Sequence, residues 1–300
     1  MSKQSIIALV GAWAAVVWAA AASAQLEQAP AVPAFAQADS IVVQGAEFFD
    51  RIVYVPVTIN GRGPLPYVLD TGAGQISAVD QAVADSLAVK SAPLAVGGGA
   101  GEEQVPFTVV EPVSLALPGL SFDARKLIGI PLHRMDPHWG KRKDGLLGGD
   151  LLSTLVTDID YDRERVVFHD ARTYEHRGPG ERVPLQNFGN YIFVQAQVLL
   201  YGAEDPVEAL MMVDTGVRIT TFNAPFSRAH ALAARSPRTT RGVTGYGLGG
   251  VSRGVVGRVR GLRLGSILVE NLVVDCSTDT TGVLASDNFS GIIGADVLSR

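Results

Sequence analysis

The sequence predicts an all-β (mainly β) chain made of two related halves. Segments rich in β-branched residues alternate with turn signals, which is typical of strands. One pattern also occurs twice: an Asp-Thr-Gly triplet at residues 70–72 and 214–216 follows an apolar run each time. An apolar-apolar-Gly segment ends at Gly148 and at Gly294, 78 and 80 residues after the respective aspartate. This agreement in spacing indicates an internal duplication.

The first 24 residues are expected to be a signal peptide. Lys3 supplies a positive start, residues 6–22 are apolar, and Ala22-Ser23-Ala24 provides a small-x-small cleavage pattern. A retained membrane anchor is the alternative, because about 17 apolar residues lie near the lower limit for crossing a bilayer. The cleavage pattern favours release. We therefore expect an exported protein, periplasmic or secreted, without stable membrane association.

The rest of the chain divides into four predicted segments. Residues 25–39 are rich in alanine, proline and glutamine and predict a flexible leader. An N-terminal lobe is expected over residues 40–172 and a C-terminal lobe over residues 183–300. Between them, residues 173–182 contain Gly178-Pro179-Gly180, which is typical of a linker.

Strands and turns can be assigned in order along the first lobe. Residues 52–59 are rich in β-branched side chains and precede Asn60-Gly61, which predicts a hairpin into the strand that carries Asp70. A short helix is expected over residues 80–87. Residues 159–168 then read as a hairpin that closes the lobe.

The second lobe repeats this order but ends early. We expect a strand over residues 191–200, a turn at Tyr201-Gly202, the strand that carries Asp214, and a helix over residues 224–234 with Asn223 as its N-cap. No counterpart of the closing hairpin follows Gly294. Because an unpaired sheet edge invites association, we interpret the sequence as a fragment, unless another segment completes the sheet.

Composition argues against several classes of function. The net charge is −5 and the 25 basic residues are scattered, so no nucleic-acid partner is expected. Cys276 is the single cysteine, which leaves no intramolecular disulfide and predicts a small buried hydrophobe. His133 and His138 lie in one loop, but Pro137 between them denies them a common helical face. We expect no metal site and no cofactor.

The repeated aspartates suit one kind of chemistry. Two carboxyl groups about 3 Å apart cannot both ionise and therefore share one proton. The ionised group can take a proton from a water molecule, while its protonated partner donates to the carbonyl that the water attacks. The glycine permits a tight turn against the carboxylate, and the threonine can bond across to the other half. We expect Asp70 and Asp214 to form one site.

The two triplets, together with the segments at residues 145–150 and 291–296, resemble aspartic proteases of the pepsin and retropepsin type. The resemblance covers nearly all of residues 40–300 and implies a bilobal fold of two related β-barrel-like lobes, with a catalytic dyad of Asp70 and Asp214. It implies that the dyad is supported by Thr71, Gly72, Thr215 and Gly216. The size of the lobes and the spacing of the motifs resemble two fused retropepsin units more than a pair of pepsin lobes, as in a bacterial-like two-lobe retropepsin-like protein.

The implied activity is that of an aspartic endopeptidase, a hydrolase that cleaves a polypeptide substrate with water activated between two aspartates. With both triplets in one chain, the site would form in cis and a monomer would suffice. A catalytically inactive peptide-binding protein with the same fold is the alternative.

Two departures from the family pattern place the chain in a particular branch. Retroviral members usually pair an aspartate near the triplet with an arginine after the downstream glycine. The equivalent positions here hold Gly74, Gly149, Arg218 and Ala295. The chain therefore looks more like the cellular and bacterial members. Pepsins often carry a hydroxyl directly after the triplet, which Ala73 and Val217 lack, so we expect a pH optimum less acidic than that of pepsin.

Family members cover the cleft with a glycine-rich hairpin. The candidates are residues 95–101, with Gly98 and Gly99, and residues 242–250, with Tyr246. Ordinary turns are the alternative for the first. The Gly-x-Gly-x-x-Gly pattern in the second fits a dinucleotide fingerprint, but the residues after it lack helical character, so we interpret it as accidental.

Polar residues near the two motifs have plainer expected roles. Asp150 and Asp296 directly follow the downstream segments and are expected to cap short helices. Trp139, beside the basic run at residues 141–143, could border the cleft, and a solvated loop is the simpler expectation.

Overall fold

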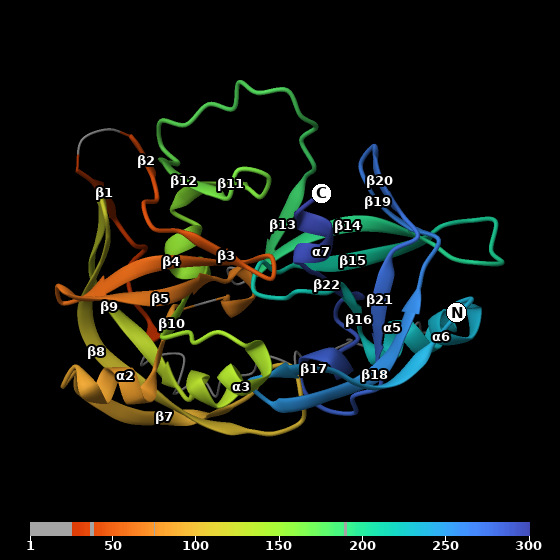
Figure 1. The fold of residues 1–300 in the computed structure, drawn as a ribbon, viewed down its shortest axis with the longest axis horizontal. Coiled ribbons are helices and arrows are strands. Elements are labelled where there is room, and N and C mark those ends of the chain that lie inside the picture. Colours follow the sequence, from red (N-terminus) through yellow and green to blue (C-terminus); the bar gives the residue numbers. More distant parts are fainter. Residues whose placement is uncertain (1–25, 37–38, 75, 189–190) are drawn as a thin grey trace, which may run out of the picture.

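The computed structural model describes residues 26–36, 39–74, 76–188 and 191–300. The predicted signal peptide lies outside these residues. Two sheet-rich lobes lie side by side, the first drawn from red to green and the second from green to blue (Figure 1). The predicted mainly-β, two-lobed fold is confirmed. In the described part of the chain, no helix is long and apolar enough to cross a membrane.

The described residues of the first lobe form a nine-stranded sheet and a three-stranded sheet. The main path of the larger sheet runs β1-β9-β6-β10-β5-β4-β8-β7, and β3 pairs with β4. Its strands are β1 (Pro33–Phe35), β3 (Glu47–Phe49), β4 (Ile52–Ile59), β5 (Arg62–Leu69), β6 (Ala78–Asp80), β7 (Ser91–Gly97), β8 (Val105–Leu117), β9 (Leu120–Ile130) and β10 (Gly145–Leu147). Because β8 also pairs with β9, the path folds back on itself without being a strict barrel.

Local sequence explains the hairpin and the helix beside the first triplet. Asn60 and Gly61 both adopt positive φ, 50° and 73°, which suits a tight turn between β4 and β5, as predicted. Helix α2 (Gln81–Ser86) matches the expected helix. It begins after Asp80, whose side chain accepts hydrogen bonds from the N–H groups of Ala82 and Val83.

The smaller sheet contains the predicted closing hairpin and the first strand after the leader. Strands β11 (Leu155–Asp160) and β12 (Arg165–Asp170) form the hairpin, and β2 (Ser40–Val42) pairs with β12. The leader, which was expected to be flexible, is instead partly ordered on the first lobe, because β1 pairs with β9 and Ala31 is buried. Residues 171–184 contain no helix or strand and connect the two lobes, where the linker was predicted.

The second lobe contains a ten-stranded sheet among its described residues, with the main path β17-β18-β21-β16-β22-β15-β14-β19-β20 and β13 paired to β14. Its strands are β13 (Leu185–Phe188), β14 (Tyr191–Leu199), β15 (Val207–Val213), β16 (Thr221–Phe222), β17 (Thr240–Gly247), β18 (Gly250–Arg258), β19 (Gly261–Leu264), β20 (Ile267–Glu270), β21 (Val273–Ser277) and β22 (Gly291–Ile293). The predicted strands around Tyr201-Gly202 are present as β14 and β15.

The helix expected over residues 224–234 is two short helices, α5 (Ala224–Ala229) and α6 (Leu232–Arg235). Ala231 between them adopts a left-handed conformation, with φ of 51°, which ends the first helix. Asn223 occupies the N-cap position of α5, as predicted, but its side chain makes no capping bond and instead donates to the carbonyls of Ser286 and Phe289.

The remaining helices are one turn long and lie close to the two motifs. They are η1 (Thr71–Ala73), η2 (Leu132–Met135), α3 (Asp136–Trp139), α4 (Gly149–Leu152), η3 (Val283–Ala285) and α7 (Ala295–Leu298). Each lobe has its own apolar core, and Cys276 is buried in the second, as predicted.

Candidate active site

The two Asp-Thr-Gly triplets begin where a buried strand ends. Strand β10 runs parallel to β5, and the carbonyl of Leu147 accepts a hydrogen bond of 3.0 Å from the N–H of Asp70. In the second lobe β22 runs parallel to β15, and the carbonyl of Ile293 accepts a bond of 3.0 Å from the N–H of Asp214. The downstream apolar strand of each lobe therefore fixes the backbone of its aspartate.

The two threonines connect the triplets to each other. The N–H of Thr71 donates to Thr215 Oγ1 at 3.2 Å, and the N–H of Thr215 donates to Thr71 Oγ1 at 3.1 Å. Thr71 Oγ1 donates to the carbonyl of Val213, and Thr215 Oγ1 to that of Leu69, both at 2.7 Å. Four hydrogen bonds thus hold the two loops in one relative position.

The two glycines allow the carboxyl groups to approach. A Cβ atom on Gly216 would lie 2.7 Å from Asp70 Cγ, and a Cβ on Gly72 would overlap the carboxyl of Asp214. Each carboxyl group therefore lies against the glycine of the opposite triplet, and the two side chains hydrogen-bond to each other. The structure brings Asp70 and Asp214 together within a single chain.

The environment of the two aspartates favours their protonated forms unequally. Burial raises the pKa of Asp70, while N–H groups of Ala73 and Gly72 and the charge of Lys143 oppose this rise. Burial and the charge of Asp70 raise the pKa of Asp214 well above its ordinary value. The pair therefore shares one proton, and its surroundings favour protonation of Asp214 over Asp70.

Behind each aspartate loop, a hydroxyl bonds to the downstream segment. Ser77 Oγ accepts from the N–H of Gly148 at 2.9 Å and donates to Asp150 at 2.7 Å. In the second lobe, Thr220 Oγ1 accepts from Gly294 and donates to Asp296 at 2.8 Å. The same arrangement in both lobes joins the aspartate loop to the strand that anchors it.

The prediction that Asp150 and Asp296 cap helices is therefore wrong. The N-cap positions of α4 and α7 are held by Gly148 and Gly294 without a capping side chain. Burial raises the pKa of Asp150 to about 6 despite its bond from Ser77. The recurrence of a hydroxyl residue seven and six positions after the two aspartates was the sequence signal for these pairs.

Trp139 lies where the first lobe contacts the second lobe. Its indole N–H donates to the carbonyl of Tyr246 at 3.1 Å, and its carbonyl accepts from Arg218 at 2.7 Å. Arg218 also pairs with Asp50 of the first lobe at 2.8 Å. The loop that carries Trp139 is therefore an inter-lobe contact rather than the solvated loop that the basic run suggested.

Lys143 is the functional candidate that the sequence does not reveal. Its side chain is 1% exposed, its Nζ lies 3.8 Å above the Trp139 ring, and Asp136 Oδ1 is also 3.8 Å away. Burial lowers the pKa of Lys143 to about 8. The amine is thus a buried cation that acts on Asp70. Nothing in the run at residues 141–143 distinguishes it from its more exposed neighbours.

Both predicted flap segments belong to hairpins. Gly98 and Gly99 lie in the connection between β7 and β8, and Tyr246 lies on β17, which pairs with β18. The tips meet, because the N–H of Gly249 donates to the carbonyl of Ala100 at 2.9 Å. The strand β18 follows the Gly-x-Gly-x-x-Gly pattern where a dinucleotide site needs a helix, so the interpretation of that match as accidental holds.

Two other side chains contact this region. Tyr191 of β14 packs over Gly74, two residues after the first triplet, and a Cβ there would overlap its ring. The ring of His138 stacks on Tyr246 with centroids 3.8 Å apart.

His133 bridges Asp80 and Asp144 at 3.2 and 2.9 Å. Within the described ranges, no group of three or more His, Cys, Asp or Glu residues is arranged to hold a metal ion.

The sequence profile of the aspartyl protease family matches the chain twice, over residues 55–151 and 197–297. Each match contains one triplet and its downstream segment. The chain belongs to the aspartyl protease family.

Comparison with solved structures also finds similar chains. One of them is the aspartic proteinase from Irpex lacteus, to which this chain is similar with 10% sequence identity and a TM-score of 0.47. The match covers 87% of this chain and 92% of that chain. Comparison with curated proteins finds no match.

Proposed function

We propose that this protein is an aspartic endopeptidase that hydrolyses peptide bonds with water activated between Asp70 and Asp214. The observation that carries the proposal is the hydrogen-bonded carboxyl pair, in which each group lies against the glycine of the opposite triplet. Membership of the aspartyl protease family supports it.

The two carboxyl groups take different roles because their pKa values differ. Ionised Asp70 accepts a proton from the attacking water, and protonated Asp214 donates to the carbonyl oxygen of the scissile bond. This pairing yields a tetrahedral intermediate without a covalent bond to the protein. Asp70, now protonated, then donates to the leaving nitrogen as the C–N bond breaks, while ionised Asp214 takes a proton from a hydroxyl of the intermediate, which restores the starting protonation of the pair.

The substrate is an extended polypeptide. The two hairpins meet at Ala100 and Gly249, and we propose that they form the cover over the dyad, because an extended chain can add to their strand edges through its backbone. Opening of these hairpins would admit the chain, and closure would exclude water. The raised pKa of both aspartates supports activity at a less acidic pH than that of pepsin.

The test is digestion of denatured casein between pH 3 and 7 by the wild-type chain and by Asp70→Asn and Asp214→Asn. We expect cleavage by the wild type and a loss of about a thousandfold or more in each variant. Asp287→Asn, at an exposed position, is the matched control and should cleave normally. Binding of casein without cleavage by the wild type would instead support an inactive peptide-binding protein.

The active form is proposed to be a monomer with the site formed in cis. Both aspartates of the pair come from one chain. Specific activity should therefore be independent of protein concentration. A rise in specific activity on concentration would instead indicate that two chains assemble the site.

The protein is also proposed to be exported. The proposal rests on Lys3, the apolar residues 6–22 and the pattern Ala22-Ser23-Ala24. Expression of the full sequence in a Gram-negative host should yield a periplasmic chain that begins at Gln25. An uncut chain in the membrane fraction would support the anchor instead.

A further inference from the structure

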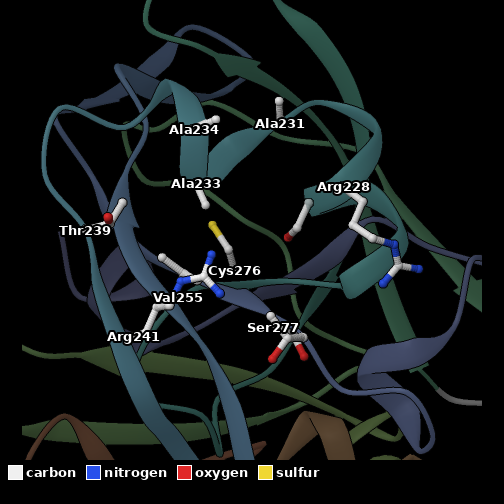
Figure 2. Close-up of a pocket in the computed structure, with 11 residues that line it drawn as sticks. Arg228, Ala231, Ala233, Ala234, Thr239, Arg241, Val255, Cys276 and Ser277 are labelled. Carbon is white, nitrogen blue, oxygen red and sulfur yellow. The ribbon is translucent and has the colours of Figure 1, made fainter.

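The second lobe contains a cavity of about 350 Å³ that is separate from the two aspartates. It lies between helices α5 and α6 on one side and strands β17, β18 and β21 on the other (Figure 2). None of its lining residues belongs to the Asp-Thr-Gly triplets or to the hairpin tips that meet at Ala100 and Gly249. The cavity is therefore a second concave site on the molecule.

The lining of the cavity combines an apolar floor with positive charge. Ala233, Val255 and the thiol of Cys276 form an apolar surface, and Figure 2 shows the Cys276 sulfur directed between α6 and β17. The guanidinium of Arg241 extends from β17 toward this thiol, whereas Arg228 on α5 lies on the opposite side. No acidic side chain lines the cavity.

The positive charge at this site is not neutralised by the protein. Among the residues that the structure describes, neither Arg228 nor Arg241 forms an ion pair, although several other arginines of the chain do. Ser227, Ser277 and Thr278 add hydroxyl groups to the same lining. An anionic group entering the cavity would meet unpaired guanidinium and hydroxyl donors, while the nearest carboxyl, Asp275, lies behind the lining beside Cys276.

We propose that this cavity binds a small organic carboxylate. The carboxylate pairs with the guanidinium of Arg241, which presents two parallel donors to it. The apolar body of the ligand packs on Ala233, Val255 and Cys276. A volume of about 350 Å³ lies at the lower end of ligand-binding pockets and suits a compact molecule such as an aromatic or branched carboxylate.

The cavity lies at the base of the hairpin formed by β17 and β18. Arg241 on β17 is directly opposite Val255 on β18, and the same two strands continue to the tip at Gly247 and Gly250. A bound ligand would contact both strands without entering the cleft. Binding is therefore expected to be independent of the dyad, and Asp214→Asn should bind the carboxylate as the wild type does.

Titration of the full chain with three probes at constant ionic strength tests the proposal. Amide chemical shifts in the NMR spectrum should show saturable binding of benzoate near Arg241, Val255 and Cys276. Benzyl alcohol, which lacks the charge, and inorganic phosphate, which lacks the apolar body, should each bind at least about tenfold more weakly. Equal binding of benzoate and benzyl alcohol would overturn the proposed role of the charge.

Variants locate the binding site. Arg241→Gln should weaken benzoate binding about tenfold or more, whereas Arg263→Gln, at an exposed position on β19, is the matched control and should not. Unchanged benzoate binding in Arg241→Gln would overturn the proposal.

Cys276 provides a measurement that needs no variant. It is the only thiol of the chain, it is buried at the floor of the cavity, and burial raises its pKa to about 12, so its reaction with iodoacetamide is slow and reagent that reaches it in the folded protein passes through the cavity. Benzoate should slow this reaction in proportion to its occupancy, while phosphate at the same concentration should not. Saturable benzoate binding with an unchanged rate of alkylation would place the ligand elsewhere and contradict the proposed site.

Discussion

Thr71 and Thr215 exchange hydrogen bonds across the two lobes, each backbone N–H donating to the hydroxyl of the other residue at 3.2 and 3.1 Å. Each hydroxyl also donates to a carbonyl at the end of the opposite aspartate strand. The relative position of the two carboxyl groups therefore depends on two side chains that are not themselves acidic.

Replacement of Thr215 by valine should destabilise the protein and separate the two loops. The change leaves the N–H of Thr71 and the carbonyl of Leu69 without their partner, which should lower the free energy of unfolding by about 2 kcal/mol or more. Urea denaturation measures the change. Thr215→Ser keeps the hydroxyl and is the control; equal stability of the two variants would contradict the assigned bonds.

Replacement of Gly72 by alanine should abolish activity more than it affects folding. The new Cβ would occupy the space of the Asp214 carboxyl, so the pair would have to separate. A displacement of about 1 Å in a catalytic group costs roughly a hundredfold in rate. Casein cleavage and circular dichroism measure the two effects.

The control for this change is Gly178→Ala in the exposed segment between the lobes, where a Cβ would contact only the ring of His176, at 3.3 Å. This variant should retain normal cleavage. Full activity of Gly72→Ala would show that the carboxyl pair does not have to lie as the structure places it.

The fold and the aspartate pair could be predicted because both are encoded by short local patterns that repeat. An apolar run followed by Asp-Thr-Gly sets a strand and a turn, and the second copy indicates that two such turns meet. The hairpin at Asn60-Gly61 is equally local, since it needs only two residues that tolerate positive φ. These features depend on few distant contacts.

The features that escaped prediction depend on residues far apart in the sequence. Strand β1 forms in the expected leader because Phe122 and its neighbours on β9 offer an edge about 90 residues away. Asp150 bonds to Ser77, 73 residues earlier, rather than to the helix beside it. Lys143 is buried only because Trp139 and the second lobe cover it. The spacing of apolar residues along the sequence does not indicate contacts of this kind.

The charge of Lys143 should set the acidic side of the pH profile. Lys143 lowers the pKa of Asp70, and its own pKa of about 8 keeps it charged at lower pH. In Lys143→Met the pKa of Asp70 should rise, so less of the carboxylate is ionised and kcat/KM at pH 5 should fall about threefold relative to its plateau. The profile of kcat/KM between pH 3 and 8 measures this shift.

Two controls separate charge from packing at this position. Lys143→Arg keeps the positive charge and should keep the acidic limb in place. Lys141→Met removes a cation from the same run that pairs with Glu47 instead, and it should leave the limb unchanged. If the acidic limb of the Lys143→Met profile coincided with that of the wild type, or lay at lower pH, the electrostatic role of Lys143 would be contradicted.

Asp275 should make the protein less stable as the pH rises. Burial and the charge of Asp279 raise its pKa to about 6, above the value of about 4 that an unfolded chain gives. Below pH 4 Asp275 is protonated in both the folded and the unfolded state, so its ionisation does not affect the free energy of unfolding. Between about pH 4 and 6 the unfolded state loses its proton first, so the free energy of unfolding falls, by about 3 kcal/mol at most, and then levels off.

Asp275→Asn removes this dependence, because an amide does not titrate. The variant should match the wild type in stability near pH 4 and exceed it increasingly toward pH 7, as measured by urea denaturation at each pH. Asp287→Asn, at an exposed position outside the core, is the control and should show no such gain. Parallel stability curves for the wild type and Asp275→Asn between pH 4 and 7 would show that the buried carboxyl is not held protonated by its surroundings.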